Sequence, residues 1–142
     1  MTLYLLDSDH LSLYQRGYEP LRNYFLRIPP DQIFISIISV EELLRGRLAQ
    51  VRRGTKPEER VQAYYWFSKT IDFLCCFNIL EFGTQAEAYF QSLSSKKIRI
   101  GNQDLKIAAI ALSNQAVLVT RNRQDFEQQI PSLEIEDWSI VQ

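Results

Sequence analysis

Four carboxylic acids stand where predicted strands end or where the following helices begin. Asp7 ends the first predicted strand, Glu42 and Asp104 fall in the first turns of two predicted helices, and Asp125 follows a later strand by five residues. Because the carboxyl ends of parallel strands meet at one edge of a sheet, we expect these acids to converge there. Carboxylates that repel one another at a shared rim are tolerated mainly when a cation lies among them.

The residue types indicate which cation that would be. A ligand set of carboxylate oxygens favours a hard ion, Mg²⁺ or Mn²⁺. His10 is the only histidine, and the two cysteines, Cys75 and Cys76, are adjacent, which fits neither a histidine-based metal site nor a zinc site. Both cysteines lie in an apolar run at 73–77, so we expect them to be small core residues. A carboxylate-held metal suits phosphodiester cleavage, because it activates water and neutralises charge on the phosphate.

Each acid taken alone also has a structural interpretation. Acidic residues are favoured in first helical turns, so Asp104 could be an ordinary N-terminal helix acid, and Glu42 completes a capping box that starts at Ser39. Asp7 is harder to explain this way, because a strand-end carboxylate beside a hydrophobic run must be hydrogen-bonded or paired.

The elements that must position these acids alternate along the chain. Short apolar or β-branched runs predict strands at 3–6, 33–37, 77–80, 117–120 and 133–135. Capping and periodicity predict helices at 39–53, 58–73, 84–93 and 101–112, with a short helical turn at 125–129. This alternation predicts an α/β fold: a single domain over 1–142 with a mostly parallel central sheet of about five short strands and helices on both faces.

Composition narrows the functional classes. With 142 residues, 46% hydrophobic and 23% charged, the chain is neither disordered nor collagen-like, and no apolar run approaches the ~20 residues of a membrane helix. The five glycines are scattered and form no Gly-x-Gly-x-x-Gly, which argues against a dinucleotide site. The N-terminus lacks the pattern of a signal peptide, so we expect a cytoplasmic protein.

The net charge of −1 conceals an uneven distribution. Residues 43–70 hold seven cations and two acids, whereas 124–142 hold five acids and no Lys or Arg. The basic stretch is either a track for an RNA backbone or a solvated helix face, and charge alone does not separate these interpretations. We expect the aromatic residues Tyr64, Tyr65 and Trp66 to pack in the core or in a dimer interface rather than to stack on bases.

Four short sequence blocks, in this order along the chain, are similar to the motifs of a known family. They are Leu-Leu-Asp-Ser-Asp at 5–9, Glu-Glu-Leu-Leu-Arg-Gly at 41–46, Gly-Asn-Gln-Asp-Leu-Lys-Ile-Ala-Ala at 101–109 and Thr-Arg-Asn-Arg-Gln-Asp-Phe at 120–126. Together with the tail at 133–138, they resemble the PIN-domain family, and in particular the VapC-like toxin ribonucleases of bacterial type II toxin–antitoxin pairs. The resemblance spans essentially the whole chain.

The resemblance implies a metal-dependent endoribonuclease that leaves a 5′-phosphate and a 3′-hydroxyl, with Mg²⁺ or Mn²⁺ as cofactor. The implied acidic set is Asp7, Glu42, Asp104 and Asp125, with Glu42 selected over Glu41 by the family's Glu-Leu-x-x-Gly pattern. Neighbouring helix residues point about 100° apart, so only one of the two glutamates faces the site.

Three further residues match polar positions around the acids. Ser8 and Asn122 match positions that in the family orient acids or water. Asp9 stands where relatives often carry Asn, and it is either a fifth acid near the metal or, as we favour, the cap of the helix that carries His10. We expect His10 to be a helix-start residue near the rim of the site rather than a general base.

Partners also follow from the resemblance. It implies an RNA substrate, a small VapB-like antitoxin protein that covers the active site, and a homodimer, with no membrane association. The alternative is a non-catalytic RNA- or protein-binding PIN-like module, in which the acids only bind a cation or a basic peptide.

Overall fold

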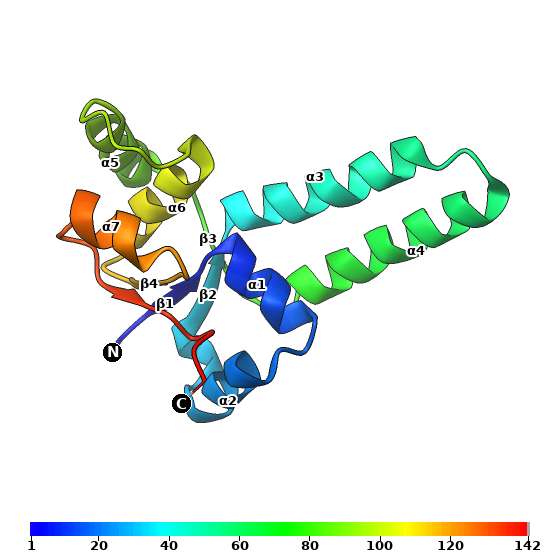
Figure 1. Ribbon diagram of the computed structural model, residues 1–142, viewed down its shortest axis with the longest axis horizontal. Coiled ribbons are helices and arrows are strands. Elements are labelled where there is room, and N and C mark those ends of the chain that lie inside the picture. Colours follow the sequence, from blue (N-terminus) through cyan, green and yellow to red (C-terminus); the bar gives the residue numbers. More distant parts are fainter. Residues whose placement is uncertain (142) are drawn as a thin grey trace.

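A parallel sheet of five short strands organises residues 1–141, which the computed structural model describes (Figure 1). The strands run in the order β3-β2-β1-β4-β5. Their bounds are β1 Tyr4–Leu6, β2 Ile33–Ser36, β3 Asn78–Leu80, β4 Val117–Val119 and β5 Ile135–Glu136. At the carboxyl end of the central strand, Leu6 is in register with Ile35 and with Val119. The predicted parallel α/β architecture is therefore confirmed.

Seven α-helices and one 3-10 turn connect the described strands. Their bounds are α1 Ser8–Gln15, α2 Glu19–Arg27, η1 Pro30–Gln32, α3 Ile37–Arg53, α4 Pro57–Leu74, α5 Thr84–Ser94, α6 Asn102–Ser113 and α7 Arg123–Gln129. Helix α2 has no counterpart among the predicted elements. Two local features mark it: Gly17, whose φ of 79° ends the preceding helix, and Pro20 in its first turn.

The central strands are buried on both faces, as a sheet covered by helices requires. On one face, Leu5 and Leu118 pack in a cluster with residues of α5 and α6. On the other face, Leu6 and Val119 pack with residues of α1 and α2 and with the fully buried Trp138 of the C-terminal segment. Adjacent strand residues thus pack against helices on opposite faces of the sheet, which confirms the expected helices on both faces.

Helix α3 starts earlier than the sequence pattern predicts. The Ser36 hydroxyl accepts a hydrogen bond from the Ser39 backbone N–H at 3.1 Å, so Ser36 rather than Ser39 is the N-cap. Glu42 consequently lies in the second turn of α3, and the predicted capping box is wrong. This leaves the Glu42 carboxylate free for contacts outside its own helix.

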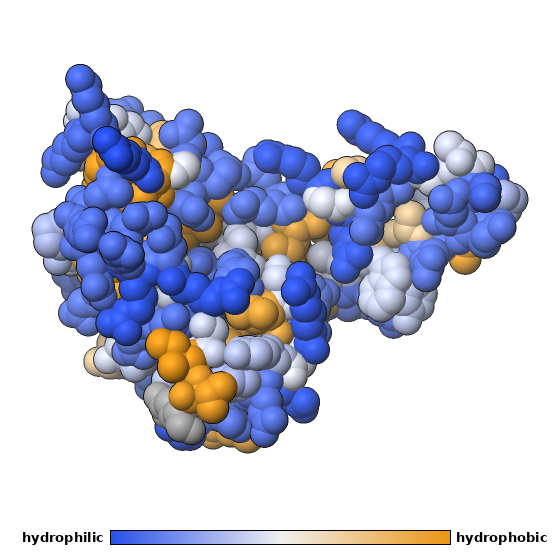
Figure 2. Space-filling view, viewed as in Figure 1, coloured by the Kyte–Doolittle hydropathy of each residue, from blue (hydrophilic) through white to orange (hydrophobic). Residues whose placement is uncertain are grey.

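Helices α3 and α4 form a two-helix arm that projects from the body of the molecule (Figure 1). The buried residues of α4 are Ala63, Thr70 and Leu74. Tyr64, Tyr65 and Trp66 are 61%, 52% and 42% exposed. Of the two expected environments, packing in a dimer interface stays a prediction, and packing in the core of the chain is wrong. The reason is that α4 packs against a single neighbouring helix along most of its length, which buries only a narrow stripe. Figure 2 shows mainly hydrophilic residues over this arm.

Cys75 and Cys76 are exposed, which contradicts the predicted core position. They follow directly after α4, in the turn that leads to β3. Phe73, Leu74 and Phe77 of the same apolar run pack in one cluster, and the turn leaves the two cysteines outside it.

Candidate active site

Asp7 stands at the junction between β1 and α1 and caps the helix. Its Oδ1 accepts the backbone N–H of His10 at 2.8 Å and faces the His10 Nδ1 at 3.1 Å. His10 is fully buried, and its Nε2 accepts the Trp138 backbone N–H at 3.2 Å. Nε2 also lies 3.4 Å from Asp137 Oδ1. With Nε2 as the acceptor of the Trp138 N–H, the neutral ring has its proton on Nδ1, which donates to Asp7. His10 lies at the helix start, as expected, but it is a buried link and not a rim residue.

Glu42 is held by a chain of serine hydroxyls. The Ser8 hydroxyl donates to Glu42 Oε1 at 2.7 Å, and the Ser39 and Ser8 hydroxyl oxygens are 2.9 Å apart. Because the Ser8 proton is used toward Glu42, Ser39 must donate to Ser8. Ser36 and Ser39 are fully buried, so these hydroxyls have few rotamers and fix the direction of the Glu42 carboxylate.

Asp104 lies in the first turn of α6, in the electrostatic field of the other two acids. The residue as a whole is exposed, yet partial burial of its carboxyl group raises its pKa. The negative charges of Asp7 and Glu42 raise this pKa further. Within residues 1–141, no side chain or backbone N–H forms a hydrogen bond or an ion pair with the Asp104 carboxylate. The charges of Asp7 and Glu42 thus act on an Asp104 carboxylate that no described basic side chain neutralises.

The other acidic candidate, Asp125, is exposed in the first turn of α7. In the described part of the chain it has no hydrogen bond, ion pair or resolved electrostatic contact with the other three acids. Asn122 is the N-cap of α7, and its backbone N–H donates to the Thr120 hydroxyl at 3.1 Å. Its side chain makes no cap hydrogen bond. The roles of Asp125 and Asn122 therefore remain predictions.

Asp9 is not the helix cap, because Asp7 occupies that position. Asp9 instead forms a bidentate ion pair with Arg121, with Nε–Oδ2 at 2.5 Å and Nη2–Oδ1 at 2.9 Å. This pairing raises the pKa of Arg121. Asp7, Asp9 and His10 each offer one potential ligand atom within 4.8 Å of the others. The sequence analysis predicted neither the ion pair with Arg121 nor the buried position of His10. The three-residue spacing between Asp7 and His10, about one helical turn, could have indicated that these two side chains interact.

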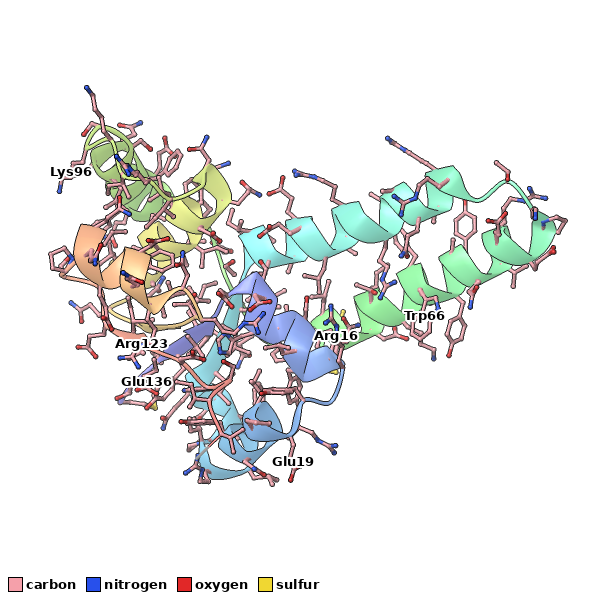
Figure 3. The ribbon with its side chains drawn as sticks, viewed as in Figure 1. Arg16, Glu19, Trp66, Lys96, Arg123 and Glu136 are labelled. Atoms are coloured by element: carbon pink, nitrogen blue, oxygen red, sulfur yellow. The ribbon has the colours of Figure 1, made fainter. Side chains whose placement is uncertain are left out.

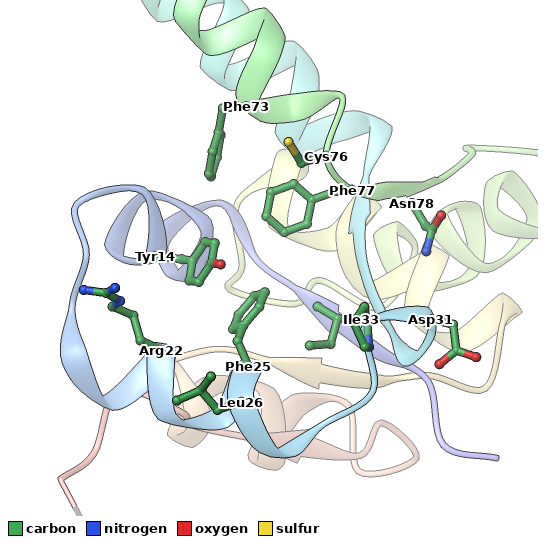
Figure 4. A pocket seen from close by; sticks show the side chains of 11 residues that line it. Tyr14, Arg22, Phe25, Leu26, Asp31, Ile33, Phe73, Cys76, Phe77 and Asn78 are labelled. Atoms are coloured by element: carbon green, nitrogen blue, oxygen red, sulfur yellow. The ribbon is translucent and has the colours of Figure 1, made fainter.

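A separate, mainly apolar pocket has a volume of 790 Å³, and Figure 4 shows the side chains that line it. Its lining includes Tyr14, Phe25, Phe73, Cys76 and Phe77. Tyr14 stacks on Phe25 with ring centroids 3.9 Å apart. Its walls are mainly aromatic and aliphatic, and none of the acidic candidates lines it, so this pocket does not fit the metal chemistry described above.

The PIN domain family profile matches residues 4–129, which include all four candidate acids. The chain belongs to the PIN-domain family. The parallel α/β fold is that of a PIN domain, as the four sequence blocks indicated. The assignment of the four acids to one site stays a prediction.

Curated relatives and a solved structure place this PIN domain among VapC proteins. It is 32% identical over 143 residues to "Ribonuclease VapC2" of Rickettsia felis, an alignment that covers 96% of this chain and 98% of the relative. It is 28% identical to the "tRNA(fMet)-specific endonuclease VapC" of Salmonella typhimurium, covering 84% and 85%. A DNA-bound VapBC crystal structure from Salmonella typhimurium contains a chain with a TM-score of 0.74 and 26% identity, covering 97% of this chain and 99% of that chain.

A search of residues 1–141 for membrane spans finds no helix with the length and apolar character to cross a bilayer.

Proposed function

We propose that this PIN domain is a metal-dependent endoribonuclease and the toxin of a toxin–antitoxin pair. The observation that carries the proposal is the Asp104 carboxylate, unpartnered within residues 1–141, in the field of Asp7 and Glu42: partial burial, and then the negative charges of those two acids, raise the pKa of Asp104. Full-length similarity to VapC ribonucleases supports the same reaction class. We place the activity in the cytoplasm and in the single domain that the sequence predicts.

Asp7, Glu42 and Asp104 are suited to hold Mg²⁺ or Mn²⁺, with Asp125 as a fourth acid from α7. The donor set consists of carboxylate oxygens, which hard divalent ions prefer. Asp7 Oδ2 and the Asp104 carboxylate have no hydrogen-bond partner within the described chain, which leaves their lone pairs free for a cation. When bound, such an ion activates water and neutralises charge on the phosphate in flight.

The protein itself supplies orientation. His10 and the α1 backbone occupy Asp7 Oδ1, so Oδ2 is the oxygen that faces the site. The serine chain holds Glu42 through Ser8. Such groups outside the ligand shell fix ligand direction, which is the usual role of hydrogen-bond partners around a metal centre. The predicted products carry a 5′-phosphate and a 3′-hydroxyl.

We also propose an antitoxin partner of the VapB type and a homodimeric toxin. The support is the similarity to a toxin chain that was solved within a VapBC complex on DNA. Two observations test this proposal. A short open reading frame directly upstream should encode a DNA-binding protein, and the two purified proteins should form a complex.

The decisive experiment measures cleavage of 5′-labelled RNA, beginning with initiator tRNA because one relative is specific for it. Cutting should require Mg²⁺ or Mn²⁺, stop with EDTA, and disappear in Asp104→Asn and Glu42→Gln. Glu41→Gln is the matched control: Glu41 points away, accepts hydrogen bonds from Gln103 and Arg45, and should be dispensable.

The alternative, a non-catalytic binding module, makes the opposite prediction. It requires RNA binding with no turnover in either metal, and the same RNA affinity in wild type and Asp104→Asn. Metal-dependent cleavage that survives both acid substitutions would refute the proposed site.

A further inference from the structure

A groove lined mainly by polar and charged residues leads from Glu42 along the α3–α4 arm. Ser8, Asp9 and Glu42 line the end near the acids, whereas Arg47 and Trp66 line the part beside the arm. This groove has a volume of 780 Å³. A second hollow of 430 Å³ shares Arg47 and Trp66 with it and continues to the turn between α3 and α4.

Three arginines face this groove and carry charge that is not neutralised. Arg16 ends α1, Arg47 lies in the middle of α3, and Arg53 ends that helix. None of them forms an ion pair within residues 1–141, in contrast to Arg121 at the acid cluster. The acids that face the same space are Asp9, which Arg121 neutralises, Glu42 at the inner end and Glu59 at the outer end. Figure 3 labels Arg16 at the end of α1 and Trp66 on α4.

Arg47 is held in place by neutral partners. Its Nε donates to the Thr70 hydroxyl at 2.9 Å and its Nη1 donates to Gln50 Oε1 at 3.0 Å. Its guanidinium carbon lies 5.5 Å from the centre of the Trp66 ring. Thr70 is 1% exposed, so a buried hydroxyl on α4 is dedicated to orienting this guanidinium. A fixed, unneutralised arginine is the arrangement that binds phosphate oxygens, because its remaining N–H groups stay available.

Gly46 supplies the free space beside Arg47. It lies in the interior of α3, where glycine costs about 1 kcal/mol relative to alanine. A Cβ added at Gly46 would meet no atom within 4 Å, so packing within the chain does not require glycine. Because Gly46 lines the groove, its missing side chain keeps the groove open next to the acids.

We propose that this groove carries the RNA strand away from the scissile bond, with Arg47 as its main phosphate ligand and Thr70 as the residue that positions Arg47. That the bound strand is RNA rests on the proposed function. Arg16 and Arg53 provide further phosphate contacts, and the exposed part of Trp66 offers an apolar surface to a base.

The test measures binding without cleavage, so that it does not depend on catalysis. A fluorescent single-stranded RNA is titrated with the full chain in EDTA, and anisotropy is followed at several salt concentrations. Arg47→Ala should weaken binding about tenfold, the value of one charged hydrogen-bonded contact. It should also reduce the salt slope by about 0.7, the share of one phosphate contact on a single strand. Arg27→Ala is the matched control, because Arg27 also lies over a ring, Tyr24, but on α2 outside the groove.

Two further substitutions separate positioning from folding. Thr70→Val should weaken RNA binding and lower the salt slope. Thr70→Ser should keep the wild-type affinity and salt slope, because the hydroxyl alone orients Arg47. Gly46→Leu should block the groove and abolish binding while the free energy of unfolding stays equal or rises. Trp66 fluorescence should be quenched by RNA, whereas the buried Trp138 should not respond.

Unchanged RNA affinity in folded Arg47→Ala and Gly46→Leu would overturn the proposal. Equal affinity for poly-glutamate, with the same dependence on Arg47, would also overturn it, because the groove would then be a site for acidic peptides. Groove-dependent RNA binding by a chain that cleaves no RNA would contradict the proposed function and leave the groove assignment intact.

Discussion

Replacing His10 with alanine tests whether the imidazole links the candidate site to the C-terminal segment. The ring accepts the Trp138 backbone N–H and donates to Asp7, and both contacts are at least partly buried. Leaving the Trp138 N–H without an acceptor costs about 1–3 kcal/mol, and losing a hydrogen bond to a charged carboxylate costs about 1.5–3 kcal/mol. The sum, about 2.5–6 kcal/mol, is a large share of the ~5–15 kcal/mol that stabilises an ordinary domain.

The assay is urea unfolding followed by tryptophan fluorescence in a Trp66→Phe background, where the buried Trp138 is the only reporter. His10→Gln is the informative partner variant, because its amide oxygen can accept the Trp138 N–H and should recover part of the loss. Tyr18→Phe is the control. It removes an exposed hydrogen bond to the Ser139 carbonyl in the same segment and should cost less than about 1 kcal/mol.

A loss below about 1 kcal/mol in His10→Ala would refute this reasoning, since it would mean that neither buried bond stabilises the fold. Equal losses in His10→Ala and His10→Gln would point to packing of the ring and not to the Trp138 N–H. RNA cleavage should fall with His10→Ala even at low temperature, where the variant is folded, because Asp7 Oδ1 loses the partner that directs Oδ2 toward the site.

Three other predictions follow from the site and from the end of α4. Ser8→Ala should lower RNA cleavage about 10- to 100-fold with little change in urea midpoint, because Glu42 loses its orienting donor; a kinetic assay at saturating metal checks this. The raised pKa of Asp104 means that the native chain binds more protons than the unfolded chain just above the ordinary aspartate pKa. Metal-free stability should therefore fall as pH rises through that window, and the fall should vanish in Asp104→Asn. Cys75 and Cys76 should both react with a thiol reagent in the native state, and slow reaction that requires denaturant would contradict their exposure.

The fold was predictable because its determinants are local and repeated. Short apolar runs separated by capped helices specify a parallel α/β sheet, and in that topology strand ends meet at one edge. This is why Asp7, Glu42 and Asp104 could be assigned together. Asp125 differs because a connection of several residues separates it from its strand, and neither periodicity nor topology determines where such a connection directs a side chain.

The errors in predicted burial along α4 have one physical origin. Hydrophobic patterning predicts burial on the assumption that each helix packs its apolar face against the body. Helix α4 lies in an arm, so residues such as Tyr65 and Trp66 stay exposed, and the polar Thr70 is buried instead. No sequence pattern indicates that the Thr70 hydroxyl accepts a hydrogen bond from Arg47, 23 residues earlier in the chain.

Helix α3 connects the two parts of the molecule that matter for the proposed chemistry. Its N-terminus is anchored by Ser36 at the end of β2, its second turn carries Glu42, and its middle carries Arg47. Five residues separate Glu42 from Arg47, so they differ by about 7.5 Å along the helix axis. Because both groups belong to one rigid helix, their spacing cannot vary with loop motion. If the groove binds RNA as proposed, a strand bound at Arg47 presents its phosphates to the acids at a fixed offset.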